Sequence, residues 1–197
     1  MTQAPLDSLC RELAAAFRRD ARGGGVTELL ARYADEHRDW CEFARFRDET
    51  YSRNLVHRDR DYELLLLCWG EGHTSAIHNH AQQSCWMAVL EGDLEEVHYR
   101  EPALSDAPGS PLVVGRTQRL TAGQVAFIED GIALHLIRPA AGSSGVSLHL
   151  YAKPIDQCRI YCPDTGRCEE IEMGYHSVRG EPCTKSPEAV RAEFLRS

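Results

Sequence analysis

From Tyr62 onward the chain is a succession of short apolar runs separated by turn residues, and this pattern constrains its fold more than any other feature. The runs span 62–69, 84–90, 94–99, 112–120, 125–128, 134–138, 146–151, 159–162 and 168–173. Many short strands at such spacing predict an antiparallel β-sandwich or small barrel. Between two of the runs, Glu91-Gly92-Asp93 has the composition of a tight turn and predicts a hairpin.

The N-terminal segment, residues 1–48, has a different pattern that predicts helices. Apolar side chains recur at helical spacing from Leu6 to Phe17. The three glycines at 23–25 end this helix, and Thr27 is a candidate N-cap for the next one. We expect these helices to pack against the outside of the β-structure.

The chain of 197 residues has the size of one domain. We therefore expect a single domain over 1–197, with its β-core at 49–180. Ser186 and Pro187 have the character of a helix cap and first turn. They predict a helix within the C-terminal tail, residues 181–197.

Charge and hydropathy exclude some classes of partner. With 22 basic and 30 acidic side chains, the formal net charge is −8, which argues against nucleic-acid binding and adsorption to anionic membranes. Charges interrupt residues 1–20, so no signal peptide is predicted. No run approaches the roughly 20 apolar residues of a membrane span. We expect a cytoplasmic protein, and we take a monomer as the default because the sequence leaves the oligomeric state open.

The chain contains eight cysteines, but they lack paired CxxC spacing. Without a secretion signal, reduced thiols in the core are the simplest interpretation. A zinc site is the alternative for the four C-terminal ones, although their irregular spacing lacks the close pairs of structural zinc sites. These four are Cys158, Cys162, Cys168 and Cys183.

A pair of histidines provides the strongest indication of chemistry. On a strand, residues i and i+2 point to the same face, so His78 and His80 can direct two imidazoles to one point inside a barrel. His135, at the start of a later apolar run, is the best candidate for a third ligand. Three imidazoles suit either iron or zinc, so the ligand types leave the metal open.

These histidines lie within segments that resemble the two cupin motifs. Residues 72–92 resemble the first motif, with a glycine at each end and Cys85 where the motif usually has a Glu ligand. Residues 123–135 resemble the second motif, although Glu129 and Asp130 replace its usual proline start. The resemblance implies a mainly β, cupin-type antiparallel barrel or jelly roll with an N-terminal helical segment.

Three further segments narrow the resemblance to the cysteine dioxygenase family. They are YSRNLV at 51–56, LCWGEGH at 67–73 and SLHLY at 147–151. The similarity extends from about residue 51 to residue 180, with the motifs in the family's order. Cys85 is also the residue that this family has in the cupin Glu position.

The resemblance implies an Fe(II) site formed by His78, His80 and His135. Iron oxygenases often use two His and one carboxylate, and a third neutral His leaves the full +2 charge on the ion. A substrate thiolate supplies the missing anion, its amine takes a second position, and one position remains for O₂. The implied reaction converts L-cysteine and O₂ to cysteine sulfinate, the second stage of thiol oxidation.

The resemblance also assigns substrate-binding residues. Arg53 is expected to bind the substrate carboxylate, because a guanidinium offers two parallel donors that lysine cannot copy. Tyr51 is expected to support the same carboxylate through its hydroxyl. Cys158 corresponds to a family cysteine near the substrate pocket, although a core thiol is an equally simple interpretation.

Ser147, His149 and Tyr151 alternate along one predicted strand and therefore share a face. A hydroxyl, an imidazole and a phenol in this arrangement can form a hydrogen-bonded relay, near which we expect Trp69. In the family such a triad orients the tyrosine hydroxyl at the iron. The resemblance further implies a thioether crosslink between Cys85 and Tyr151.

One departure from the family bears on the substrate. The animal enzymes follow the tyrosine with Ser-Pro-Pro and a cis bond, whereas this chain has Ala152-Lys153-Pro154. A cis Ala152–Lys153 bond would cost about 2.5–4 kcal/mol, so we expect trans. The altered segment keeps 3-mercaptopropionate, or another small thiol, as an alternative substrate. Arg53 favours cysteine, because enzymes for 3-mercaptopropionate usually carry Gln there. An alternative of another class is a non-catalytic ligand-binding cupin.

Overall fold

A computed structural model of the protein describes residues 4–103, 107 and 109–194. The N-terminal part forms α1 (Pro5–Arg19), α2 (Val26–Glu36) and the 3₁₀ helix η1 (Asp39–Phe43), as predicted for a helical segment. Thr27 is not the N-cap of α2. That position belongs to Gly25, whose φ of 84° lies in the left-handed region that glycine adopts without steric cost.

The rest of the described chain is mainly β-structure, as predicted, and ends in helix α3 (Pro187–Phe194). The strands are β1 (Ser52–Arg58), β2 (Tyr62–Trp69), β3 (Ile77–His78), β4 (Cys85–Arg100), β5 (Val113–Thr121), β6 (Val125–Ile128), β7 (Leu134–Pro139), β8 (Gly145–Ala152), β9 (Gln157–Tyr161), β10 (Cys168–Glu172), β11 (Ser177–Val178) and β12 (Glu181–Pro182). The predicted start of α3 is confirmed, because the amide of Ala189 donates to Ser186 Oγ at 3.3 Å. No described helix is long and apolar enough to cross a membrane.

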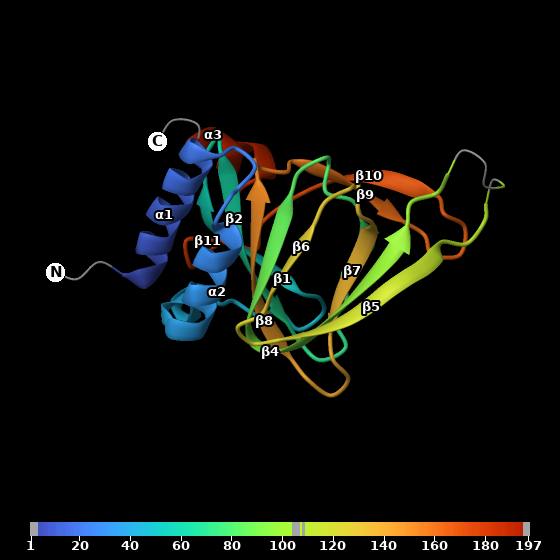
Figure 1. The fold of residues 1–197 in the computed structure, drawn as a ribbon, viewed down its shortest axis with the longest axis horizontal. Helices are drawn as coiled ribbons and strands as arrows, with labels where there is room; N and C mark the ends of the chain where they lie inside the picture. Colours follow the sequence, from blue (N-terminus) through green and yellow to red (C-terminus); the bar gives the residue numbers. More distant parts are fainter. Residues whose placement is uncertain (1–3, 104–106, 108, 195–197) are drawn as a thin grey trace.

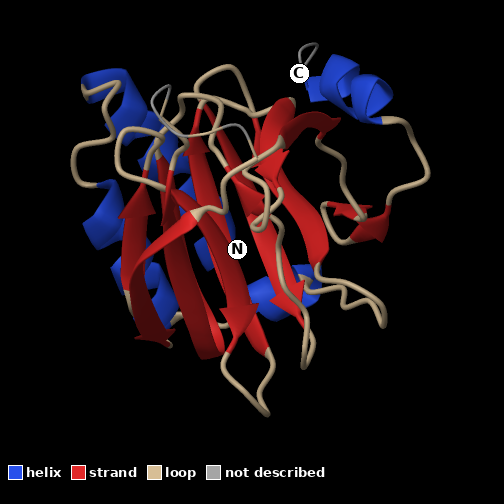
Figure 2. Ribbon diagram, turned by 90° about the vertical axis from the view of Figure 1, so that its right-hand side faces the viewer, coloured by secondary structure: helices blue, strands red, loops and turns tan. Residues whose placement is uncertain are grey.

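The strands pair in the order β10-β9-β3-β7-β4-β8-β2-β1-β11-β12, with β5 and β6 also paired to β4. Strand β4 connects the two halves of the sheet: its first part pairs with β6 and β8, and its second part with β5 and β7. Pairing is antiparallel except between β1 and β11. Figure 2 shows the strands at the centre of the molecule, with the helices around them.

The predicted hairpin at Glu91-Gly92-Asp93 is wrong, because β4 runs through these residues without turning back. The register with β8 shifts between Val89 and Glu91, so the irregularity is a bulge within one long strand. At Gly92, φ is 73° and an added Cβ would lie 2.1 Å from the carbonyl oxygen of Ser144. The glycine is therefore needed for close passage of two strands and not for a turn.

Two apolar cores lie on opposite faces of β2, β4 and β8. On the outer face, residues such as Leu64 and Leu148 pack against α1 and α2, which lie on one flank of the strands (Figure 1). On the inner face, Leu65, Leu67 and Met87 fill the barrel interior. Burial on both faces explains why β2 reads as a continuous apolar run in the sequence.

The segment that replaces Ser-Pro-Pro has trans peptide bonds, as predicted, and the described residues contain no cis bond. Lys153 instead adopts a φ of 78°, an uncommon conformation for a residue with a side chain.

Candidate metal centre and substrate cavity

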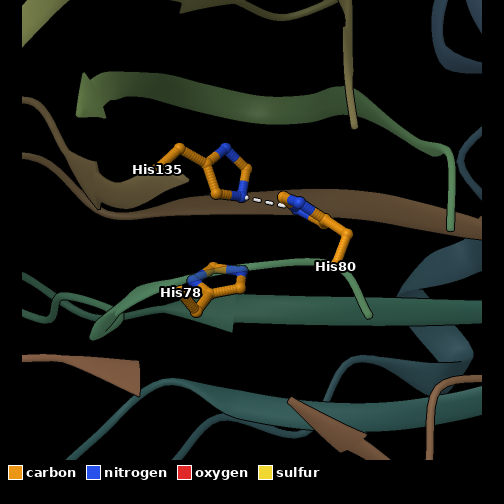
Figure 3. A group of neighbouring side chains, drawn as sticks. All are labelled: His78, His80 and His135. Carbon is orange, nitrogen blue, oxygen red and sulfur yellow. Dashed lines mark hydrogen bonds between the residues drawn. The ribbon is translucent and has the colours of Figure 1, made fainter. Parts of the chain in front are cut away.

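Three histidines converge inside the barrel, and Figure 3 shows their rings facing one another. His78 ends β3, His135 lies opposite it on β7, and His80 follows two residues after His78. Their ligand nitrogens all lie within 4.8 Å of one another, with 3.0 Å between the Nε2 atoms of His80 and His135. Among the described residues, this is the only such group of three or more potential ligands.

His80 reaches this point from a loop, so the strand-alternation argument explains only part of the geometry. Strand β3 ends at His78, and the left-handed residues Ala81 and Gln82 follow His80. Asp130 holds this loop in place: its carboxylate accepts from the amide of His80 at 2.5 Å and from that of Gln82 at 2.8 Å. The sequence placed Asp130 in the second motif but gave no indication of this role.

The far nitrogens of two of these rings have acceptors that orient them. The carbonyl of Ala76 lies 2.9 Å from Nδ1 of His78 and can only accept, so Nδ1 carries the hydrogen. The carboxylate of Glu96, 1% exposed, lies 2.6 Å from Nδ1 of His135. Each ring therefore presents Nε2 to the common point, as metal-ligating histidines do when a carboxylate or carbonyl binds their other nitrogen. Nδ1 of His80 is buried, 3.6 Å from Asp130 Oδ1.

Burial keeps the imidazoles of His78 and His135 neutral. It lowers the pKa of His78 to about 3, with the neighbouring His80 adding to the effect. Burial and the other two histidines also hold the pKa of His135 well below its usual range. Neutral imidazole is the form that binds a metal ion, so the donor set fits Fe(II) or another divalent transition metal.

A cavity of about 60 Å³ adjoins the candidate metal centre through His78, which forms part of its wall. Its size suits a small molecule. Polar and sulfur-containing side chains on its wall include Tyr51, Arg53, His78, His149, Tyr151 and Cys158. Apolar residues complete the lining, among them Leu67, Ile137, Ile155, Ile160, Ile171 and Met173. The structure thus brings the sequence-predicted substrate residues to one cavity beside the candidate metal centre.

Arg53 is 6% exposed and has a donor directed to no protein group. Its Nε donates to the carbonyl of Gly174 at 3.1 Å, whereas its buried Nη2 has no partner among the described residues. A buried charged donor without a partner is costly, and a ligand carboxylate would satisfy it. The ring of Tyr51 lies nearby, stacked on Trp69 with 4.6 Å between the ring centroids.

Two of the three residues in the predicted relay, Ser147 and His149, are joined by a hydrogen bond. Ser147 Oγ lies 2.9 Å from Nε2 of His149 and accepts from Nε1 of Trp69 at 2.9 Å, so the expected proximity of Trp69 is confirmed. The ring of Tyr151 comes next, with its centroid 6.4 Å from that of His149. Burial raises the pKa of Tyr151 well above its usual range, so its hydroxyl stays protonated near neutral pH.

Cys85 and Tyr151 face each other across the β4–β8 pair as direct register partners. Both side chains are buried and belong to the core of the barrel interior. Burial raises the pKa of the Cys85 thiol above its usual range, so it is not a thiolate at neutral pH. Directly opposite side chains in an antiparallel pair approach each other closely, which brings this thiol and phenol together.

The remaining cysteines do not form a second centre. Cys158 is in the cavity wall, with its Sγ 3.3 Å from Sδ of Met173, whereas Cys162 and Cys168 are exposed. All eight described cysteines are free thiols. The zinc interpretation of the C-terminal cysteines is wrong, because the structure does not bring them together within the described part of the chain.

A mainly β fold with three converging imidazoles, two of them buried, beside a small cavity defines a cupin-type barrel protein with a candidate metal centre. The family model for cysteine dioxygenase type I matches residues 1–163. The chain therefore belongs to the cysteine dioxygenase family.

Two vertebrate relatives agree with this assignment. A cysteine dioxygenase type 1 from Danio rerio is 34% identical over 183 residues, covering 89% of this chain and 88% of the relative. The Homo sapiens protein of the same name is 34% identical over 157 residues, covering 79% of this chain and 77% of that relative. A solved Klebsiella pneumoniae protein with a double-stranded β-helix domain is 16% identical, covers 71% of this chain and 99% of that chain, and has a TM-score of 0.47.

Proposed function

We propose that the protein is an iron-dependent cysteine dioxygenase that converts L-cysteine and O₂ to cysteine sulfinate. One observation carries the proposal: Arg53, which has an unpartnered donor, and His78, one of three converging imidazoles, line the same small cavity. His78, His80 and His135 would hold Fe(II), since a set of three imidazoles fits that ion. When bound, the ion supplies the redox chemistry and a Lewis-acidic site for the thiolate.

The protein groups bind and orient the substrate. Arg53 binds the carboxylate with a charge-assisted pair of hydrogen bonds, and Tyr51 supports it from the neighbouring wall. The apolar lining excludes water from the sulfur. Tyr151, protonated because burial raises its pKa, donates a hydrogen bond toward the reacting end of the substrate. Ser147 and His149, on the same strand as Tyr151, orient each other's side chains through their mutual hydrogen bond. Cys158 completes the wall near the substrate.

The activity is tested by oxygen uptake of the iron-loaded protein with L-cysteine, with the product identified by mass. We expect O₂ consumption and the addition of two oxygen atoms to the thiol. Turnover that strongly favours 3-mercaptopropionate would replace cysteine by that thiol as the substrate. Metal-independent ligand binding without O₂ uptake would instead support the non-catalytic alternative.

We also propose that Cys85 and Tyr151 become joined by a thioether bond during turnover. Their positions as buried register partners support this. The new bond joins Sγ to a ring carbon, each partner loses one hydrogen, and O₂, the oxidant of the proposed reaction, accepts the two electrons and protons. The link would restrict the tyrosine rotamer and hold its hydroxyl in place.

Peptide mass spectrometry after extended turnover should show a loss of two hydrogens in linked peptides containing Cys85 and Tyr151. Cys85→Ser should lack this species but keep iron and part of the activity, because neither residue is a proposed ligand. Cys68→Ser is the matched control, since Cys68 is also buried but lies on the helix-covered face of β2. Recovery of only free Cys85 and unmodified Tyr151 would rule the crosslink out.

The single-domain organisation, the cytoplasmic location, the monomeric state and the absence of nucleic-acid or membrane partners stay predictions from the sequence. Size-exclusion chromatography with light scattering measures the oligomeric state directly.

A further inference from the structure

The segment 172–176 lies beyond the family-model match and forms three hydrogen bonds with Arg53, the proposed substrate arginine. The carbonyl of Gly174 accepts from Nε of Arg53 at 3.1 Å. Nδ1 of His176 accepts from the amide of Arg53 at 2.8 Å, and the amide of His176 donates to the carbonyl of Arg53 at 2.8 Å. The direction of the guanidinium therefore depends on where this segment lies.

Between Gly174 and His176, the side chain of Tyr175 enters a buried charged cluster with Glu63 and Arg58, here called the Glu63 cluster. Glu63 is 0% exposed, and its Oε1 accepts from the hydroxyl of Tyr175 and from Nη1 of Arg58, the latter at 2.9 Å. Nη1 of Arg58 also lies 2.7 Å from the tyrosine oxygen. Burial and the Glu63 carboxylate raise the pKa of Tyr175, so its hydroxyl remains a donor.

Strand register places this cluster next to the cavity. On β2, Glu63 is the partner of Arg58 on β1 and of Tyr151 on β8. Side chains alternate along a strand, so Glu63 shares the inner face of β2 with Leu65 and Leu67. Its carboxylate acts electrostatically on both Arg53 and Tyr151.

Helix α3 holds the same segment from the other side. Arg191 donates to the carbonyl of Met173 at 3.1 Å and to Oε1 of Glu172 at 3.0 Å. It also forms an ion pair with Asp156 at 2.8 Å, and Asp156 in turn accepts from Nη2 of Arg58 at 2.6 Å. The segment is thus held between α3 and the Glu63 cluster.

Stability alone is a weak explanation for such a cluster. Replacing a buried ion pair by apolar residues of similar volume is often neutral or stabilising, so burial of charge is poor evidence for a stabilising role. A buried polar network does specify one arrangement of the chain, because alternative arrangements leave more of its charges unpaired. In the Glu63 cluster Oε1 of Glu63 is paired, whereas its buried Oε2 has no partner among the described residues. Here the arrangement that the cluster specifies is the one that presents Arg53 to the cavity.

We propose that the Glu63 cluster is a positioning device for Arg53, and so sets the preference of the cavity for thiols that carry a carboxylate. The identity of the ligand, a thiol with a carboxylate, rests on the proposed function. The contacts between the Glu63 cluster, the segment 172–176 and Arg53 do not depend on it. Glu63, Arg58 and Tyr175 act through the segment 172–176 and do not contact the substrate.

The test compares binding of L-cysteine and of cysteamine, which lacks the carboxylate, to iron-loaded protein without oxygen. Tyr175→Phe keeps the ring but removes the hydrogen bond to Glu63. We expect its Kd for L-cysteine to rise by about three- to tenfold, as for partial loss of a charge-assisted contact, with the Kd for cysteamine and the iron content unchanged. Tyr33→Phe is the matched control, because it removes a hydroxyl that donates to Asp39 at 2.9 Å among the N-terminal helices.

Glu63→Gln provides a second variant in case Tyr175→Phe does not fold, and it should change the ratio of the two Kd values in the same direction. Equal changes for both thiols, or an unchanged ratio in the folded variants, would overturn the proposal. Oxygen uptake by the unmodified protein is measured in parallel. Selective binding of L-cysteine without uptake would refute the dioxygenase activity but leave the binding ratio as a valid test of the Glu63 cluster.

Discussion

Replacing His135 by alanine should remove both bound iron and turnover of L-cysteine. Two imidazoles would remain, and the buried Glu96 carboxylate would lose the ring nitrogen that now lies 2.6 Å away. Loss even of a group that orients a metal ligand typically lowers metal affinity or activity about 10–100-fold, so loss of the ligand itself should exceed this.

Iron content after dialysis, measured beside oxygen uptake, checks this expectation. His37→Ala is the control, because His37 follows α2 among the N-terminal helices and is outside the group of three histidines. Circular dichroism would show whether the buried Glu96 has disturbed the fold of the His135 variant. A folded His135→Ala protein with full iron and full activity would remove this residue from the metal site.

The second large effect is expected for Arg53→Ala, which removes the only guanidinium on the cavity wall within the described residues. A hydrogen bond to a charged group contributes about 1.5–3 kcal/mol, which is roughly ten- to more than a hundredfold in an equilibrium constant. Binding and kcat/KM for L-cysteine should fall by at least this factor. Cysteamine should be hardly affected, because it has no carboxylate to lose a partner.

Arg53→Lys separates charge from geometry, since lysine keeps the positive charge but not the planar pair of donors. It should recover only part of the loss. Arg138→Ala is the surface control, because Arg138 pairs with Glu95 at 2.9 Å and is half exposed. Similar losses for cysteine and cysteamine would contradict a role in carboxylate recognition. 3-Mercaptopropionate also carries a carboxylate, so it should lose turnover together with cysteine in this variant.

Much of the fold and of the candidate site could be predicted because the signals are local. The apolar run of β2 and the short run of β6 have the predicted bounds, since alternation and continuity of apolar residues report directly on which faces are buried. The three histidines were found from spacing within segments that resemble known motifs. Arg53 and Tyr151 came from the same resemblance, and the structure brings both to the cavity.

The tertiary structure decided what depends on partners from distant parts of the chain. Whether Gly92 lies in a turn or in a bulge depends on the strands that pair with β4. These strands, among them β6 and β8, come more than 20 residues after Gly92 in the sequence. The local sequence does not distinguish a turn from a bulge, because a glycine with positive φ is suited to both.

The Glu63 cluster is the clearest case. Glu63, Arg58 and Tyr175 are residues that a sequence places by default at the surface or in an ordinary strand, and Tyr175 Oη meets Arg58 across 117 positions. The alternation of apolar and polar residues in the sequence is enough to indicate which side of a strand is buried. Only the folded chain determines whether a charge on that side finds a partner that makes its burial possible.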